Sequence, residues 1–174
     1  MGKKALIVVD MQNDFLWEKR KKMFNYDTEQ LTANVNEAIS TYKAEGCDII
    51  YIKQYYQNIA TNRLIIGFGI KGTEGAEIYS KINIVSDNIF VKYFPNTYTS
   101  KEFCRHMEKE GYDEVVLCGV DECGCVGATA KGAVKTGVKV SLLKDCTGCR
   151  FPDSKEQKMR ENLTKRGVNY INLK

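Results

Sequence analysis

Three side chains that together could perform nucleophilic catalysis, a carboxylate, an ammonium and a thiol, lie close after short apolar runs of this sequence. Asp10 and Lys92 each follow such a run directly, and Cys125 lies six residues after Gly119, with which a third run ends. A cysteine attacks as its thiolate, which forms when a neighbouring base takes the thiol proton and which a nearby cation stabilises. The residue types therefore predict a cysteine nucleophile, with Asp10 as the base and Lys92 as the cation.

Each of the three residues also has an ordinary structural interpretation. Asp10 can simply end a strand and cap a turn, Lys92 can be a solvated surface lysine, and Cys125 can be a small buried apolar residue. Apolar residues on both sides of Lys92 favour an enclosed side chain. Cys125 is predicted at the first turn of a helix, where unpaired backbone N–H groups and the positive end of the helix dipole lower the pKa of a thiol.

Six short runs rich in valine and isoleucine predict six β-strands. They are nearly continuously apolar rather than alternating, which is typical of a parallel sheet with both faces covered. The predicted strands are residues 5–9, 48–52, 88–91, 114–119, 139–143 and 169–173.

Amphipathic segments between these runs predict four helices, over residues 28–44, 100–110, 125–136 and 153–166, each followed by or ending near a glycine. Strands that alternate with helices predict an α/β fold, a Rossmann-like three-layer α/β/α sandwich around a six-stranded, mainly parallel sheet. Ligands of such sheets bind beyond the carboxyl ends of the strands. Residues 55–71 are predicted to form a loop or lid over that edge.

Composition indicates a single domain over residues 1–174 that folds without disulfides. Hydrophobic residues make up 43% and charged residues 28% of the chain, and the net charge of +4 is spread over mixed charges. The densest basic run, residues 19–22, has only four such side chains, which disfavours nucleic-acid binding, and no apolar stretch is long enough to cross a membrane. Seven cysteines, an odd number, favour a reducing, cytoplasmic location.

Four segments in order along the chain resemble the isochorismatase-like hydrolases, which include nicotinamidases, N-carbamoylsarcosine amidohydrolases and ureidoacrylate amidohydrolases. The run Asp-Met-Gln-Asn-Asp-Phe from Asp10 resembles the opening motif of the family, and Lys92 with Asn96-Thr-Tyr resembles its lysine segment. Residues 72–76, Gly-Thr-Glu-Gly-Ala, resemble a Gly-Thr-Pro-Gly-Ala turn. Residues 119–130 resemble the cysteine segment, whose spacing selects Cys125 over Cys123 and Cys118.

The resemblance implies an isochorismatase fold and a hydrolase with Asp10, Lys92 and Cys125 as its catalytic residues. It implies an oxyanion hole made by the backbone N–H groups of Cys125 and Asp121, with a cis peptide bond between Val120 and Asp121. The expected reaction is hydrolysis of a small amide or ureido compound through a thioester, favoured over vinyl ether hydrolysis. The partners implied are a small-molecule substrate and further copies of the chain in a homo-oligomer.

Departures from the family pattern bear on the substrate and on metal binding. Asp121-Glu122 stands where relatives often carry Ala-Thr, and an extra acidic group there could repel an anionic substrate such as isochorismate or bind a cationic one. Phe15, Trp17 and Tyr98 are predicted pocket walls, beside Glu122.

Nicotinamidases bind zinc through an aspartate and two histidines after the second strand. In this chain, residues 53–58 read Lys-Gln-Tyr-Tyr-Gln-Asn, and the single histidine falls in a predicted helix. We therefore expect neither a metal nor a cofactor.

Two alternatives to this hydrolase remain open at the level of sequence. Cys123, Cys125, Cys146 and Cys149 follow the fourth and fifth predicted strands, and four thiolates at one sheet edge would suit structural zinc or a dithiol redox site. The chain could instead be a non-catalytic binding protein, because a fold does not by itself confer activity.

Overall fold

A six-stranded parallel sheet forms the centre of the computed structural model, which describes residues 2–173. The strands lie in the order β3-β2-β1-β4-β5-β6, and every neighbouring pair is parallel. They are β1 (Lys4–Val9), β2 (Asp48–Gln54), β3 (Ile89–Lys92), β4 (Glu114–Val120), β5 (Lys139–Gly148) and β6 (Asn169–Ile171). The predicted six-stranded sheet is confirmed, and it is entirely parallel.

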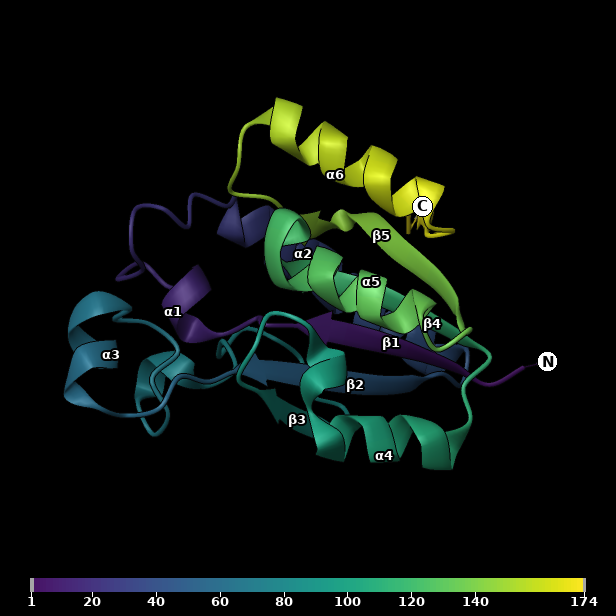
Figure 1. The fold of residues 1–174 in the computed structure, drawn as a ribbon, viewed down its shortest axis with the longest axis horizontal. Helices are drawn as coiled ribbons and strands as arrows, with labels where there is room; N and C mark the ends of the chain where they lie inside the picture. The colour runs from purple at the N-terminus through teal and green to yellow at the C-terminus, as the bar shows by residue number, and fades with distance from the viewer. Residues whose placement is uncertain (1, 174) are drawn as a thin grey trace.

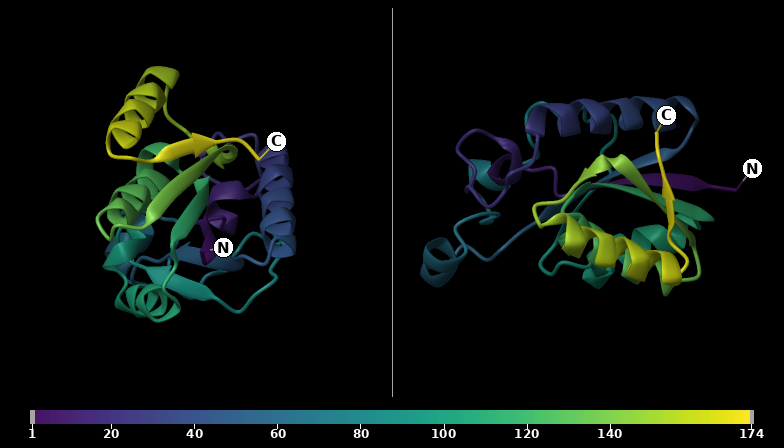
Figure 2. Two further views of the ribbon diagram at one scale, coloured as in Figure 1. Left: turned by 90° about the vertical axis from the view of Figure 1, so that its right-hand side faces the viewer. Right: turned by 90° about the horizontal axis from the view of Figure 1, so that it is seen from above.

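Helices cover both faces of the sheet, which makes the predicted three-layer sandwich. Helix α2 (Thr28–Ala44) lies on one face, and α4 (Lys101–Glu110), α5 (Gly127–Val134) and α6 (Asp153–Lys165) lie on the other (Figures 1 and 2). Asp27 caps α2, because its side chain accepts a hydrogen bond from the backbone N–H of Gln30. No helix within residues 2–173 combines the length and apolarity that crossing a membrane requires.

Two hydrophobic cores explain why the strands are continuously apolar. Along β1, Leu6 and Val8 belong to the core that includes the buried side chains of α2, whereas Ala5 and Ile7 belong to the core on the opposite face. Successive side chains of a strand point to opposite faces, so a strand covered on both sides needs apolar residues at every position.

Short elements make up the irregular segments that surround the carboxyl ends of the strands. They are α1 (Asn13–Leu16), α3 (Ala60–Ile65), and the single turns η1 (Glu74–Ala76), η2 (Thr97–Thr99) and η3 (Glu122–Val126). The predicted loop over residues 55–71 contains α3, which projects from the body of the molecule at the left of Figure 1. No side chain of α3 is buried.

Two elements differ from their predicted bounds in ways that affect the site. β5 runs five residues beyond its predicted end at residue 143, past exposed Lys144 and Asp145, because the chain pairs again with β4 after a register shift between Leu117 and Gly119. The helix predicted over 125–136 begins as α5 only at Gly127. Cys125 lies in the preceding η3, a π-helical turn in which Gly124 has non-helical dihedral angles.

Gly119 allows β4 to approach the end of β1, and we predict that Gly119→Ala is strongly destabilising. Its φ is +108°, and a Cβ there would lie 2.2 Å from the carbonyl oxygen of Val9, next to Asp10. Strain of the left-handed backbone and the overlap together should lower the free energy of unfolding by about 2–4 kcal/mol, measured by urea denaturation.

Gly137→Ala is the matched control, because Gly137 also has a positive φ, +82°, but a Cβ there would meet nothing within 4 Å. It should cost only about 1 kcal/mol, from the backbone alone. Equal losses in the two variants would show that the contact with β1 is not the constraint.

Candidate active site

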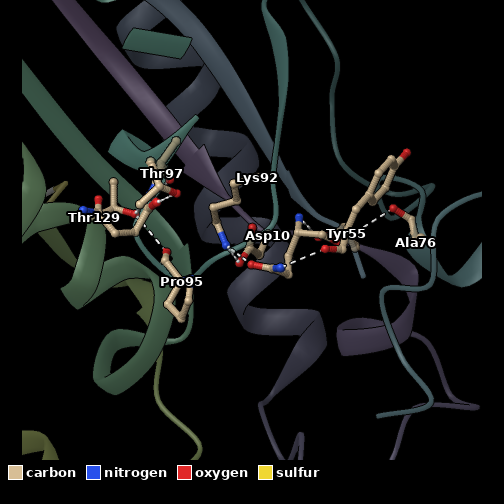
Figure 3. A network of polar contacts seen from close by, with 11 residues as sticks. Asp10, Tyr55, Ala76, Lys92, Pro95, Thr97 and Thr129 are labelled. Carbon is tan, nitrogen blue, oxygen red and sulfur yellow. Dashed lines mark hydrogen bonds and ion pairs between the residues drawn. The ribbon is translucent and has the colours of Figure 1, made fainter. Parts of the chain in front are cut away.

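A buried ion pair lies at the carboxyl edge of the sheet, between the ends of β1 and β3. Lys92 Nζ donates to Asp10 Oδ2 at 2.8 Å and to Gln54 Oε1 at 2.6 Å (Figure 3). Lys92 is fully buried and Asp10 is only 2% exposed. The structure thus brings two of the three predicted catalytic side chains into direct contact, and the surface interpretation of Lys92 is wrong.

Gln54 is the other partner of the Lys92 ammonium, and it comes from β2, the strand that lies between β1 and β3 in the sheet. It is in register with Lys92 and is itself buried. Gln12 holds its backbone, since Gln12 Nε2 donates to the Gln54 carbonyl at 3.0 Å and Gln12 Oε1 accepts the Gln54 N–H at 2.8 Å. Sequence reasoning missed both glutamines, although Gln54 ends the second strand at the edge where a ligand is expected.

Asp10 adopts a left-handed backbone conformation, with a φ of 52°. Such a conformation is uncommon for residues other than glycine, and aspartate tolerates it better than most. The Asp10 N–H still donates to the carbonyl of Ile52 at 3.0 Å, so the residue remains attached to β2 as the chain turns away from β1. Its second carboxylate oxygen, Oδ1, is buried and has no hydrogen-bond partner of good geometry among the described residues.

A second group of hydrogen bonds ties the segment after Lys92 to the helix that follows Cys125. The Thr97 N–H donates to Thr129 Oγ1 at 3.1 Å, and the two hydroxyl oxygens are 2.8 Å apart (Figure 3). Both threonines are fully buried. The lysine segment and the cysteine segment are therefore held in one rigid frame.

Cys125 completes the group, because its thiol interacts with the charges of both Asp10 and Lys92. Burial and the nearby Asp10 carboxylate raise the pKa of Cys125 to about 12, and the Lys92 ammonium opposes them only in part. The sequence-based expectation of a lowered thiol pKa is therefore wrong. Desolvation outweighs the effect of the helix start, and Cys125 lies in η3, ahead of the regular helix.

The same burial sets the direction of the other two pKa values. Burial raises the pKa of the Asp10 carboxyl above its ordinary value, against the pull of the Lys92 charge. Burial lowers the pKa of Lys92, but the negative charges of Asp10 and Cys125 outweigh it, so the pKa of Lys92 is raised overall. The thiol thus keeps its proton at neutral pH beside a carboxyl group that can accept it.

A cavity of about 180 Å³ opens onto Asp10 and Cys125. Five aromatic side chains line it. Phe24 packs edge to face with Phe15 and Phe68, with ring centroids 4.9 and 5.0 Å apart, and is stacked with Tyr26. The five are Phe15, Phe24, Tyr26, Tyr56 and Phe68. Phe15 was among the predicted pocket walls, and Tyr56 and Phe68 come from the segment predicted as a lid.

Three other residues predicted to bind substrate lie outside this cavity. Trp17 ends α1 and lines a separate surface hollow, with the ammonium of Lys19 over its ring. Tyr98 packs against Phe103 and lines a different cavity beside α4. Trp17 directly follows α1 and Tyr98 lies within η2, and these short elements direct both side chains away from the sheet edge that their sequence positions suggested.

Glu122 is the third, and its charge is fully paired. Arg160 of α6 binds both of its carboxylate oxygens at 2.8 Å, and the Tyr170 hydroxyl donates to Oε1 at 2.9 Å. Glu122 is fully buried. The predicted effect of this acidic turn on the charge of the substrate is therefore wrong for Glu122, whose partners lie far along the chain.

Asp121 lines the cavity, but both of its oxygens are occupied. Oδ2 accepts from the Tyr26 hydroxyl at 2.9 Å and from the Arg150 N–H at 2.8 Å, and Oδ1 accepts from the Cys123 N–H at 2.9 Å. The Arg150 side chain also lines the cavity, packed over the rings of Phe24 and Phe151. A guanidinium group, which sequence reasoning missed, thus lies at the cavity, with its Nε 3.9 Å from Asp121 Oδ2.

The turn between β4 and η3 has the backbone that the resemblance implied. The Val120–Asp121 peptide bond is cis. The Asp121 carbonyl accepts from the N–H groups of Gly124 and Val126, and the N–H of Cys125, which lies between them, is not among its donors. Gly124, with φ −124° and ψ −113°, breaks the helical path at this point.

The zinc site of nicotinamidases, an aspartate with two histidines, does not fit this chain. The segment that continues from β2 supplies neither residue type. His106, the single histidine, lies in α4 with its Nε2 3.3 Å from the Tyr112 hydroxyl, and it does not line the cavity.

The four cysteines of the alternative zinc or dithiol site do not converge. Cys146 is buried, with its Sγ 3.5 Å from the carbonyl of Asn34, while Cys125 lies beside Asp10 and Lys92. Of the four, Cys123 and Cys149 meet, with their sulfur atoms 3.5 Å apart. A four-thiolate zinc site is therefore contradicted.

We predict that Asp10→Asn makes the Cys125 thiol react faster with an alkylating reagent, although it removes the base that turnover would need. Removing the carboxylate removes a charge that raises the pKa of Cys125, so more thiolate forms and iodoacetamide should alkylate Cys125 severalfold faster at neutral pH. In the unmodified protein, the alkylation rate should keep rising with pH beyond 9, the ordinary pKa of a thiol, because the pKa is about 12. Mass spectrometry of the Cys125 peptide measures both rates.

Asp87→Asn, an exposed aspartate away from the cavity, is the control and should leave the rate unchanged. Slower alkylation in Asp10→Asn would mean that Asp10 does not act on the thiol through its charge.

Comparisons with known proteins identify the family of the chain. The model of the Isochorismatase domain family matches residues 4–174. The uncharacterized isochorismatase family protein YddQ of Bacillus subtilis is 27% identical over 142 residues, which cover 81% of this chain and 75% of that protein. The nicotinamidase/pyrazinamidase of Mycobacterium tuberculosis is 26% identical over 92% of this chain and 95% of that protein. The crystal structure of a pyrazinamidase of Pyrococcus horikoshii in complex with zinc superposes with a TM-score of 0.82 at 25% identity, covering 98% of this chain and 99% of that one. The chain therefore belongs to the isochorismatase family of hydrolases.

Proposed function

We propose that this protein is a cysteine amidohydrolase that cleaves a small amide or ureido compound through a thioester on Cys125. The observation that carries the proposal is a thiol at a cavity, next to a carboxylate that is anchored by a buried ammonium. Amide hydrolysis is favoured over vinyl ether hydrolysis, and the name of the Mycobacterium tuberculosis relative, a nicotinamidase/pyrazinamidase, supports that choice.

In the first half of the proposed reaction, Asp10 accepts the Cys125 proton while Cys125 Sγ attacks the amide carbonyl carbon. Oδ1 of Asp10 suits this role, because Oδ2 is held by Lys92 and Oδ1 has no partner of good geometry. Asp10 becomes neutral as it takes the proton, and the negative charge then lies on the former carbonyl oxygen of the substrate. The N–H groups of Asp121 and Cys125 would donate to this oxyanion, as in other acyl-transfer sites.

In the second half, the tetrahedral intermediate collapses and the C–N bond breaks. Asp10 returns its proton to the departing nitrogen, which leaves as ammonia or an amine, and the acyl group remains on sulfur. Asp10, again a carboxylate, then takes a proton from water, whose oxygen attacks the thioester carbonyl. The C–S bond breaks, the acid leaves, and the Cys125 sulfur takes the proton back from Asp10. Lys92 stays protonated throughout, which the raised pKa of its ammonium supports.

The charges at the cavity support an anionic substrate. The charge of Asp121 is offset by Arg150, whose Nε lies 3.9 Å from Oδ2, and Glu122 is buried against Arg160, so neither carboxylate presents an unpaired negative charge to the cavity. Arg150 supplies a guanidinium, which binds carboxylates with two parallel hydrogen bonds. We infer that the substrate carries a carboxylate beside the scissile amide.

The proposal includes a cytoplasmic homo-oligomer. All seven cysteines are free thiols, which suits a reducing compartment. Helix α3 and its flank expose Ile59, Leu64 and Ile65, whose apolar side chains suit contact with a second copy of the chain.

Replacement of the nucleophile tests the thioester. Cys125→Ser should lower kcat by about 10³-fold or more, since a serine hydroxyl is a far weaker nucleophile beside the same base. In the unmodified protein, rapid acid quenching during turnover of small amides, followed by mass spectrometry, should reveal an acyl group on Cys125. Cys104→Ser, at a part-buried thiol outside the cavity, is the control and should retain activity. An acyl group on Cys123 instead would contradict the assignment.

Replacement of Arg150 tests the charge of the substrate. Arg150→Met should lower kcat/KM for amides that carry a carboxylate by about 10- to 100-fold, equivalent to about 1.5–3 kcal/mol for a charged hydrogen bond. The methyl esters of the same compounds should lose less than about twofold. Arg166→Met, at the exposed end of α6, is the matched control. Equal losses for acid and ester would show that Arg150 does not bind a carboxylate.

A further inference from the structure

Two cysteines outside the catalytic group face each other beside the active site. Cys123 Sγ and Cys149 Sγ are 3.5 Å apart, although the residues are 26 positions apart in the sequence. A disulfide bond is about 2.05 Å long, so the sulfur atoms need to approach by only about 1.5 Å to form one. Both side chains are partly exposed, whereas Cys47, Cys118 and Cys146 are buried.

The Asp121 carboxylate holds the two chain segments at this separation. Its Oδ1 accepts from the N–H of Cys123, and its Oδ2 accepts from the N–H of Arg150, the residue next to Cys149. One side chain thus fixes the backbone on both sides of the sulfur pair. Such a fixed arrangement reduces the loss of chain entropy when the sulfurs are joined.

The same arrangement disfavours a metal ion, even though Asp121, Cys123 and Cys149 place three potential ligand atoms within 4.8 Å of one another. Both oxygens of Asp121 already accept hydrogen bonds, and Arg150 Nε lies 3.9 Å from Oδ2, where it would repel a cation. The pair is better suited to oxidation than to coordination.

We propose that Cys123 and Cys149 form a reversible disulfide bond that couples the redox state of the surroundings to the active site. The oxidant is a low-molecular-weight disulfide such as oxidised glutathione. One cysteine loses its proton and attacks a sulfur of the reagent, which gives a mixed disulfide and releases one reagent thiolate. The second cysteine then loses its proton and attacks the protein sulfur of the mixed disulfide, which releases the other. The two reagent thiolates take up the two protons, so two protein thiols are oxidised and one reagent disulfide is reduced to two thiols.

The position of the pair gives the bond a consequence for the site. Cys123 lies two residues before Cys125 in η3, and Cys149 is followed by Arg150, which lines the cavity. We expect closure of the bond to shift η3 against the loop that carries Arg150, and misplacement of a catalytic group by about 1 Å costs up to about 10²-fold in rate. This consequence rests on the proposed function, whereas formation of the bond does not.

Redox titration of the full chain tests the proposal. The protein is equilibrated in buffers with graded ratios of reduced to oxidised glutathione, quenched with acid, and its remaining thiols are alkylated. Mass spectrometry should find Cys123 and Cys149 joined in one cross-linked peptide, with a mass lower by two hydrogens, at ratios that leave Cys125 alkylatable. A thiol reductant should reverse the bond.

Cysteine variants and the rate of amide turnover complete the test. Cys149→Ser and Cys123→Ser should each prevent the cross-link, with folding checked by circular dichroism, and Cys104→Ser should still form the cross-link. Amide turnover should fall by about tenfold or more on oxidation of the unmodified chain and not of Cys149→Ser. Stable glutathione adducts without the cross-link, a Cys123–Cys125 bond, or bound zinc that prevents oxidation would each overturn the proposal. A cross-link in a chain without any amidase activity would refute the proposed function and leave the disulfide standing.

Discussion

Lys92 and Asp10 meet at 2.8 Å in a region from which water is excluded, and neither charge would be tolerated there without the other. Their strands are not neighbours, since β2 runs between β3 and β1, and Gln54 of β2 supplies the second oxygen that accepts a hydrogen bond from the ammonium. A buried ion pair contributes little to stability compared with apolar residues of the same size. Its presence at the carboxyl edge of the sheet is therefore better explained by chemistry than by folding.

The position of the pair also determines the protonation state of Cys125. In the dry surroundings of the cavity, a thiolate would face the Asp10 carboxylate, so the proton stays on sulfur and the pKa of the thiol rises. Lys92 offsets part of this cost, because its ammonium favours the thiolate. The arrangement is a thiol, a base and a fixed cation, and not a preformed thiolate of the kind that a helix N-terminus alone would produce.

The architecture and the juxtaposition of Asp10, Lys92 and Cys125 were predictable from the sequence because both depend on regular elements. Continuous apolar runs identified the strands, and the carboxyl ends of parallel strands necessarily share one edge, which placed Asp10, Lys92 and Cys125 in the same region. Trp17 and Tyr98 were misplaced because Trp17 directly follows α1 and Tyr98 lies within η2, and sequence order does not determine the direction of a side chain in such short elements. Gln54 was overlooked because the predicted strand ended at residue 52, whereas β2 continues to Gln54 and brings its amide to the edge of the sheet beside Lys92. The thiol pKa was misjudged because desolvation depends on the packed aromatic wall, which is assembled from three separate segments.

Asp121 and Glu122 illustrate how an acidic turn can serve structure instead of substrate charge. Glu122 attaches η3 to α6 through Arg160 and to β6 through Tyr170. Asp121 attaches the same turn to Tyr26 on one side and to the start of the loop after β5 on the other, through the N–H of Arg150. These partners lie in segments before and after Cys125 in the chain, so the two carboxylates attach the cysteine turn to separate parts of the fold. Asp121 is also paired with the guanidinium of Arg150, whose Nε lies 3.9 Å from Oδ2, and Glu122 is paired with Arg160. The acidic composition of the turn alone therefore does not give the charge that a substrate meets at the cavity.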